Sequence, residues 1–253
     1  MQHKITCEKS KLIVDTNGGK ILELVLNGVK ILGTYKRVDG KAGATHVCVP
    51  NFAGEGIDKF GLPFHGPARN MDWTLKDIGN VAEELHMVIE ALEHYDSSIE
   101  ITQVFIIGKD SFSQEVRVKN NGKDAVPVNI GIHNYFDTPK GWEGATINNK
   151  SIKKEIENNL AIKIANLSDF HNNHEVKIVE TQIVFPKDKK LLLHTKGASE
   201  LVTWTGVKDG KYNKDFACIE PVCWFDPKFF GTPHSLLDPG ETRVLKQDII
   251  LQE

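Results

Sequence analysis

Apolar and polar residues alternate along residues 126–136, which is typical of a β-strand with two unlike faces. The apolar positions of one parity are Val126, Val128, Ile130 and Ile132. The positions of the opposite parity are Asn129, Gly131, His133 and Tyr135. That second face offers space and hydrogen-bonding groups rather than core volume. A histidine at the end of such a strand can donate a proton at neutral pH, although an ordinary hydrogen-bonded histidine fits the pattern equally well.

The period of two recurs along most of the chain. Residues 99–107 alternate strictly, and Asn27-Gly28 stands between two short apolar runs, 21–26 and 29–32, as the turn of a tight hairpin. Further strands are expected at 5–14, 73–75, 85–92, 112–118, 176–185, 191–195, 201–205, 216–221 and 244–251, and modest helical periodicity occurs at 150–160. Short strands and frequent turns predict an antiparallel β-sandwich, and the lack of repeats or linkers predicts a single domain over residues 1–253.

Residues 51–69 follow neither period and are rich in glycine and proline. They predict a long, stiffened loop that carries Asn51, Glu55, His65 and Arg69. Loops on a rigid scaffold are where binding groups concentrate, so this loop is a candidate binding element. An ordinary surface connection is the alternative interpretation.

Composition limits the partners of the protein. The 253-residue chain has a net charge of −3, which gives no general attraction to nucleic acid or to an anionic membrane. Four cysteines without a CxxC pair favour reduced thiols in a reducing compartment. The start lacks a signal-peptide core, and no run approaches the roughly 18 apolar residues of a membrane helix. We therefore expect a cytoplasmic protein.

Common cofactor and metal motifs are missing from the sequence. The ten histidines include no HxH or HExxH, so no metal site is expected. There is no GxSxG elbow and no GxxxxGK[ST] phosphate loop, and the glycines at 54 and 56 do not join a strand to a helix. We expect neither a metal nor an organic cofactor.

Glu220 lies in a short apolar run, 216–221, that is expected to end at its proline. Ala217 and Ile219 share one face of that run, and Cys218 and Glu220 share the other. Partial burial would raise the pKa of the Glu220 carboxyl toward a useful range, and together with His133 it could run coupled acid and base chemistry. A solvated or ion-paired glutamate is the alternative when Glu220 is considered alone.

Five groups of short motifs occur in order along nearly the whole chain. They are Asn17-Gly18-Gly19 with Leu26-Asn27-Gly28, His65-Gly66-Pro67-Ala68-Arg69 with Trp73, His133-Asn134-Tyr135-Phe136, Leu201-Val202-Thr203-Trp204, and Ala217-Cys218-Ile219-Glu220-Pro221 with Leu237-Asp238-Pro239-Gly240-Glu241. In this order they resemble the aldose 1-epimerase (galactose mutarotase-like) superfamily, which includes hexose-6-phosphate 1-epimerases.

The resemblance implies an all-β fold, a large twisted antiparallel β-sandwich of the galactose mutarotase-like supersandwich type, with a sugar bound on one sheet. It implies that Glu220 takes the proton from the anomeric hydroxyl as general base. His133 would protonate the ring oxygen as general acid, and His65 and Arg69 would hydrogen-bond the sugar. Ring opening, rotation of the aldehyde and closure from the other face would then give the other anomer.

Further residues are assigned to the sugar site with the same resemblance in view. Asn51 belongs to the glycine-rich loop, Asp169 is a candidate for the third acidic residue of the family, and Trp224 and Phe225 could stack on a sugar or fill the core. Glu55 stands in the region where many members carry an arginine, and Pro67 stands where the phosphate branch has phenylalanine. Both departures favour an unphosphorylated aldose.

Several functions remain open at this point. An aldose 1-epimerase acting on a small-molecule sugar, as a monomer or homodimer, is the first. A non-catalytic carbohydrate-binding or regulatory module, or a hexose-6-phosphate 1-epimerase, could use the same fold. A lyase or hydrolase on a related sandwich would need a second catalytic carboxylate or a tyrosine near the site, and Tyr135 is the obvious phenol.

Overall fold

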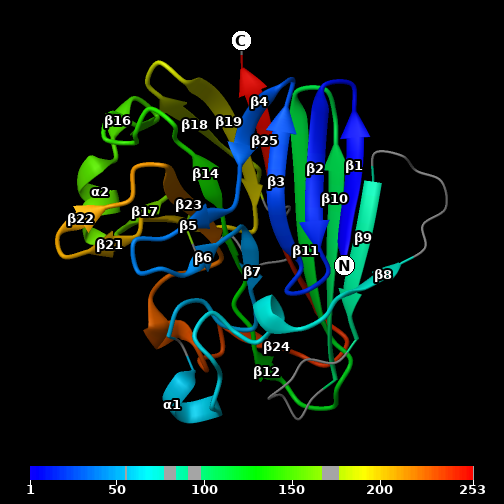
Figure 1. Cartoon of the computed structure of the whole chain (residues 1–253). Helices are drawn as coiled ribbons and strands as arrows, with labels where there is room; N and C mark the ends of the chain where they lie inside the picture. Colours follow the sequence, from blue (N-terminus) through cyan, green and yellow to red (C-terminus); the bar gives the residue numbers. More distant parts are fainter. Residues whose placement is uncertain (55, 77–83, 91–97, 167–176, 253) are drawn as a thin grey trace.

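Two antiparallel sheets carry most of the chain in the computed structural model, which describes residues 1–54, 56–76, 84–90, 98–166 and 177–252 (Figure 1). The first sheet has the order β1 (Gln2–Cys7), β2 (Ser10–Asp15), β3 (Lys20–Leu26), β4 (Val29–Leu32), β14 (Tyr135–Asp137), β23 (Phe216–Val222), β13 (Gly131–His133) and β7 (His46–Cys48), with β20 (Glu200–Trp204) paired to β23 and β17 (Ala161–Lys163) paired to β20. The second sheet has the order β16 (Lys150–Ser151), β15 (Thr146–Ile147), β18 (Val179–Phe185), β19 (Lys189–Lys196), β25 (Thr242–Gln252), β11 (Ser111–Asn120), β10 (Ile99–Ile107), β9 (Glu84–Ile89) and β8 (Thr74–Lys76).

Short elements complete the described chain. Three two-stranded ribbons pair β5 (Tyr35–Lys36) with β6 (Ala42–Gly43), β12 (Val126–Pro127) with β24 (Leu236–Leu237), and β21 (Val207–Lys208) with β22 (Lys211–Tyr212). The helical turns are α1 (Ile57–Phe60), η1 (Ala68–Asn70), α2 (Lys153–Asn158) and η3 (Pro227–Phe229). None of the helices within the described ranges has the length and apolar character that a membrane crossing requires.

The core lies between the two sheets, because each strand turns its apolar parity inward. Members of this core from both sheets include Leu24, Ile132 and Ile219 of the first and Phe105, Val116 and Ile249 of the second. Along β10 the side chains alternate between buried and more exposed, as the strict alternation at 99–107 predicts. The predicted all-β antiparallel fold is therefore confirmed.

Local turn chemistry accounts for several elements. Asn27 and Gly28 both have positive φ, 45° and 83°, as a two-residue hairpin between β3 and β4 requires, so the predicted hairpin is confirmed. The modest helical period at 150–160 corresponds to α2. Pro221, expected to end its strand, instead lies inside β23, which continues to Val222.

The strand expected to run unbroken from Val126 to His133 is divided into two, and this prediction was wrong. Pro127 lacks a backbone N–H, and β12 ends at this residue after pairing with β24 rather than with the first sheet. The chain enters the first sheet at Gly131, is interrupted at Asn134, and continues as β14. The alternation survives the break, because Ile132 and Phe136 lie in the core while His133 and Tyr135 face the opposite side.

A chain of buried side-chain amides crosses the core and reaches the interruption at Asn134. Gln103 receives a hydrogen bond from Gln114 (2.8 Å), and Gln114 receives one from Gln247 (2.9 Å). Gln247 and Asn134 exchange two hydrogen bonds of 2.8 and 3.1 Å, and Asn134 also donates to the carbonyl of Ile219 in β23. The second sheet thereby holds the short segment between β13 and β14 through polar groups that would be costly to leave unpaired.

Replacing Gln247 by leucine should lower the free energy of unfolding by about 1–3 kcal/mol, because the amides of Gln114 and Asn134 would lose partners inside the core. Urea unfolding followed by circular dichroism measures this change. The matched control is Gln2→Leu on the exposed side of β1, which should change stability by less than about 0.5 kcal/mol. Equal stability of the two variants would show that the amide chain contributes nothing.

Candidate active site

A pocket of about 700 Å³ opens on the face of the first sheet that points away from the core. The strands of the first sheet pack one face in the core, and side chains on their other face form the floor of the pocket. These are His46 from β7, His133 from β13, Tyr135 from β14, Trp204 from β20 and Glu220 from β23. The β5–β6 ribbon and the loop before η1 supply the walls. The volume lies within the range of about 300–1,000 Å³ that small-molecule sites occupy.

The pocket collects four of the residues assigned from the sequence: His65, Arg69, His133 and Glu220. Asn51 is completely buried beside it, and its side-chain amide donates to the carbonyls of Ala53 (3.4 Å) and Pro63 (3.1 Å), so it closes the loop instead of lining the pocket. Trp224 packs in the core under the guanidinium of Arg243, whereas its neighbour Phe225 lines the pocket. Asp169 lies outside the described residues.

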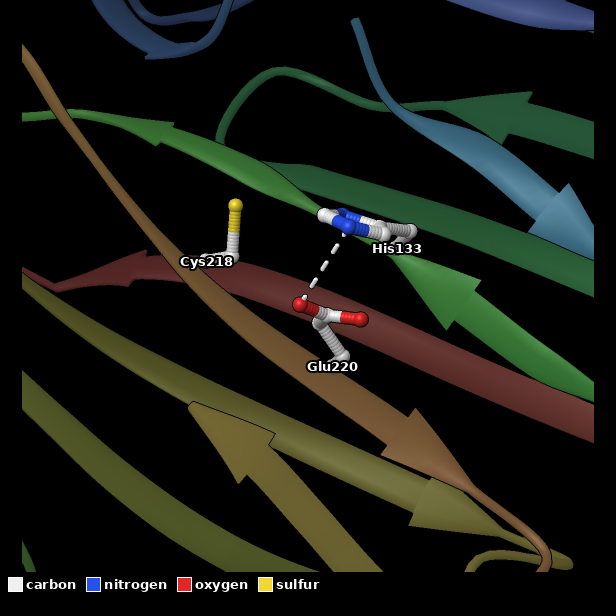
Figure 2. A group of neighbouring side chains, drawn as sticks. All are labelled: His133, Cys218 and Glu220. Carbon is white, nitrogen blue, oxygen red and sulfur yellow. Dashed lines mark ion pairs between the residues drawn. The ribbon is translucent and has the colours of Figure 1, made fainter. Parts of the chain in front are cut away.

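His133 and Glu220 form the centre of the floor, on adjacent strands with their side chains directed at each other (Figure 2). His133 Nε2 and Glu220 Oε1 are 3.5 Å apart, and the two side chains are 7% and 2% exposed. Burial, with the nearby His46, His65, Arg69 and Arg37, holds the pKa of His133 well below its usual value. Burial raises the pKa of Glu220 well above its usual value. Opposite shifts of this kind mark a pair that holds one proton between its members near neutral pH.

Two further histidines surround His133. The His46 ring stacks on it with centroids 4.8 Å apart, and the His65 ring meets it edge-on at 5.3 Å. Burial lowers the pKa of His46 to about 3 and that of His65 to about 2, so both rings are neutral at pH 7. His46 was missed from the sequence, although the parity of His46, Val47 and Cys48, with Val47 in the core, was a usable signal.

The loop fixes His65 in one tautomer. The backbone N–H of Ala53 donates to His65 Nδ1 at 3.1 Å, and an N–H cannot act as an acceptor, so Nδ1 is unprotonated. The neutral ring therefore carries its proton on Nε2, where it is available as a donor to a ligand. His65 itself has φ of 63° and the following Gly66 has φ of 74°, so the residue sits in a left-handed turn that the loop must maintain.

Gly66→Ala tests this turn. A Cβ at Gly66 would lie 2.0 Å from the carbonyl oxygen of Val49 at a φ of 74°, whereas a Cβ at Gly61 in the same loop, with φ of 65°, would meet nothing within 4 Å. We expect Gly66→Ala to lower the free energy of unfolding by about 1–3 kcal/mol more than Gly61→Ala, measured by thermal and urea unfolding. Indistinguishable unfolding of the two variants would show that the loop adjusts without cost.

The lining also bears on the alternative enzyme classes. Among the described residues that line the pocket, Glu220 is the one carboxylate, so these residues do not provide the two carboxylates of a glycoside hydrolase. Tyr135 stacks on His133 at 4.9 Å, but burial raises the pKa of its phenol, which stays protonated and is a poor base.

Three donors of kinds that bind metals meet at the same place. One ligand atom each from His133, Cys218 and Glu220 lie within 4.8 Å of one another, and all three residues are buried (Figure 2). Such a mixed donor set is compatible with zinc, but burial raises the pKa of the Cys218 thiol, so binding would have to displace its proton. The donors come from β13 and β23, which is why no spacing along the sequence indicated them.

Comparison with known proteins places the chain in a family and its fold among solved structures. A model of the aldose 1-epimerase family matches residues 16–249. No curated protein matches the chain. Among solved structures, a galactose mutarotase-like protein from Lactobacillus casei has a TM-score of 0.76 at 13% identity, with complete coverage of both chains. A galactose mutarotase related enzyme from Lactobacillus acidophilus has a TM-score of 0.71 at 15% identity, covering 100% of this chain and 98% of the other. One from Clostridium acetobutylicum, described as galactose mutarotase-like, has a TM-score of 0.67 at 16% identity, covering 99% and 94%.

Proposed function

Because the chain belongs to the aldose 1-epimerase family, we propose that it interconverts the α and β anomers of an aldose by acid and base catalysis at His133 and Glu220. Family and fold support a carbohydrate epimerase of the mutarotase type. The observation that carries the finer proposal is the buried pair itself, with Nε2 and Oε1 3.5 Å apart on the pocket floor.

The separation of the pair suits the reaction. In an aldopyranose the anomeric hydroxyl oxygen and the ring oxygen are bonded to the same carbon, so an acid and a base that address both must lie close together. Glycoside hydrolases, which add a water or a covalent intermediate, keep their two carboxyl groups at least about 5 Å apart. The 3.5 Å between His133 Nε2 and Glu220 Oε1 is shorter than that separation and suits two oxygens bonded to one carbon.

His133 and Glu220 together supply and recover every proton that the reaction transfers. The step starts from the tautomer in which the shared proton lies on His133 and Glu220 is ionised. Glu220 takes the proton of the anomeric hydroxyl, the bond between the anomeric carbon and the ring oxygen breaks, and His133 gives its proton to the ring oxygen. Rotation of the aldehyde group and reversal of these transfers yield the other anomer, with the pair back at its starting protonation. Since the pair holds one proton in either tautomer, no net proton exchange with water is required during turnover.

Neighbouring groups position the sugar. His65 lines the pocket and carries its proton on Nε2, and the side chain of Arg69 has a buried Nε–H without a partner among the described residues. Phe225 and Trp204 offer aromatic surface beside these donors, which is the usual combination for a sugar ring with one apolar face.

Anomer exchange measured by NMR exchange spectroscopy tests the proposal. The wild type should accelerate exchange of at least one sugar in a panel of aldoses and their 6-phosphates, whereas His133→Ala should not. His234→Ala, at an exposed histidine, is the matched control and should keep wild-type activity. A wild type that binds a sugar without accelerating its exchange would instead support the carbohydrate-binding module.

A further inference from the structure

We propose that the sugar bound in this pocket carries an anionic group, a phosphate or a carboxylate, which the side chains of Lys20, Arg37, Lys41 and Arg69 recognise. This inference rests on the proposed function, because it names the substrate class of the same pocket. It is carried by the charges that line the pocket and by the unused hydrogen-bond donors of its two arginines.

The charges around the pocket are strongly one-sided. Its described lining contains four cationic residues, Lys20, Arg37, Lys41 and Arg69, against the single carboxylate of Glu220. Glu220 shares a proton with His133, so the pair as a whole adds no net charge. A pocket lined by one sign of charge concentrates ligands of the opposite sign. A neutral aldose has no negative charge that could interact with these four cationic side chains.

Most of these cations are not neutralised by the protein. Arg37 Nη2 lies 2.8 Å from the carboxylate of Asp39, whereas Lys20, Lys41 and Arg69 form no ion pair with any carboxylate in the described parts of the chain. The positive charge of the two arginines also acts on the histidines at the floor of the pocket. Arg37 and Arg69 each lower the pKa of His46, His65 and His133.

The two arginines have the geometry that anions use. Each guanidinium has a buried Nε without a hydrogen-bond partner in the described structure. The edge formed by Nε–H and one Nη–H is the fork that binds two oxygens of a phosphate or carboxylate. The guanidinium carbon of Arg37 also lies 4.7 Å from the centre of the Trp204 ring, a contact that restrains the fork before a ligand arrives.

Three parts of the chain deliver the cations. Arg37 and Lys41 lie on the turn of the β5–β6 ribbon, where the Arg37 N–H donates to the Lys41 carbonyl at 2.8 Å. Lys20 begins β3, and Arg69 lies in η1. The sequence favours an unphosphorylated aldose, because Glu55 stands where many members of the family carry an arginine and Pro67 where the phosphate branch has phenylalanine. Glu55 lies outside the described residues, and two of the four cations of the pocket, Arg37 and Lys41, come from the segment 37–41.

Binding and exchange measurements on three sugars test the inference. Isothermal titration calorimetry and NMR exchange spectroscopy would compare D-glucose, D-glucose 6-phosphate and D-glucuronate at low and high salt. We expect one of the two anionic sugars to bind at least about 10-fold more tightly than D-glucose, with a preference that shrinks as salt is added. Whichever anion is preferred distinguishes phosphate from carboxylate.

Variants assign the effect to the pocket. Lys41→Ala and Arg37→Ala should each weaken binding of the preferred anionic sugar by about 10-fold, a larger loss than either variant causes for D-glucose. Lys208→Ala, an exposed lysine in β21, is the matched control and should change neither. Lys41 is exposed, so its variant is expected to fold even where Arg37→Ala loses packing on Trp204.

The outcomes separate the two proposals. Equal binding of all three sugars, or equal losses in both variants for D-glucose and the anionic sugars, would overturn the anionic substrate. Tight binding of an anionic sugar that depends on Lys41, without any acceleration of exchange, would uphold it and reject the epimerase. Exchange of D-glucose at rates equal to those of the anionic sugars would uphold the epimerase and reject the anionic preference.

Discussion

Glu220→Gln is expected to lower the turnover number for anomer exchange by about 100-fold or more while sugar binding is retained. Glutamine keeps the shape of the side chain on β23 but cannot accept and return the proton of the anomeric hydroxyl, and loss of a general base costs about 100- to 10,000-fold. NMR exchange spectroscopy gives the rate, and isothermal titration calorimetry gives the affinity.

The matched control for this substitution is Glu180→Gln on β18, whose side chain is 65% exposed and lies on the second sheet. It should leave both rate and affinity unchanged. If Glu220→Gln exchanged anomers as fast as wild type, Glu220 would not be the base and the proposed chemistry would need another group.

The second large effect concerns stability in acid. Between about pH 6.5 and 4.5, the free energy of unfolding should fall by about 2.7 kcal/mol for each unit of decreasing pH through the pocket groups alone. This slope is large compared with a typical total stability of about 5–15 kcal/mol, so the protein should unfold readily under mildly acidic conditions.

Proton counting gives the sign and size of this effect. In the unfolded chain His46, His65 and His133 bind protons as pH falls below about 6.5, whereas Glu220 binds one only near 4.5. In the folded pocket His46 and His65 stay neutral, and the His133–Glu220 pair holds one proton whichever member carries it. The unfolded state thus binds two more protons, and each contributes about 1.36 kcal/mol per pH unit. The contribution of His46 and His65 is fully present above this window and is lost as pH falls through it, whereas the proton retained by the His133–Glu220 pair makes the contribution of that pair decrease as pH rises above the window.

Urea unfolding at a series of pH values measures the slope, and His46→Gln provides an internal test. This variant removes one of the two excess protons and should halve the dependence on pH, even if its stability at neutral pH differs from that of wild type. A slope that His46→Gln leaves unchanged would show that His46 is charged in the folded protein.

The alternation of residues along each strand was sufficient to predict much of the site. His133 and Glu220 point away from the apolar parity of their own strands, and this parity is visible in a few neighbouring residues. The place of Trp224, which the sequence left open between a sugar face and the core, was not decided by parity. Continued alternation from Glu220 would bring Trp224 to the pocket, but β23 ends at Val222, and beyond its end the parity no longer holds. Phe225 occupies the pocket instead.

Pairing between distant strands could not be predicted in this way. His46 meets His133 because β7 pairs with β13, with His46 opposite His133 in the register although the two are 87 positions apart in the sequence. Nothing in residues 37–41 themselves indicated that the turn between two strands of two residues each would carry Arg37 and Lys41 to the same pocket. These contacts depend on the order of strands in the sheet, which the residue pattern of a single chain does not determine.

The break at Asn134 has a consequence for how this segment can change in length. Ile132, Asn134 and Phe136 point to the core, and His133 and Tyr135 point to the pocket. Deleting one residue just before Ile132 would exchange these two sets, placing an imidazole in the core and removing the amide that meets Gln247. Gain or loss of two residues would keep each side chain on its own face. Viable length variants of this segment should therefore differ by even numbers of residues.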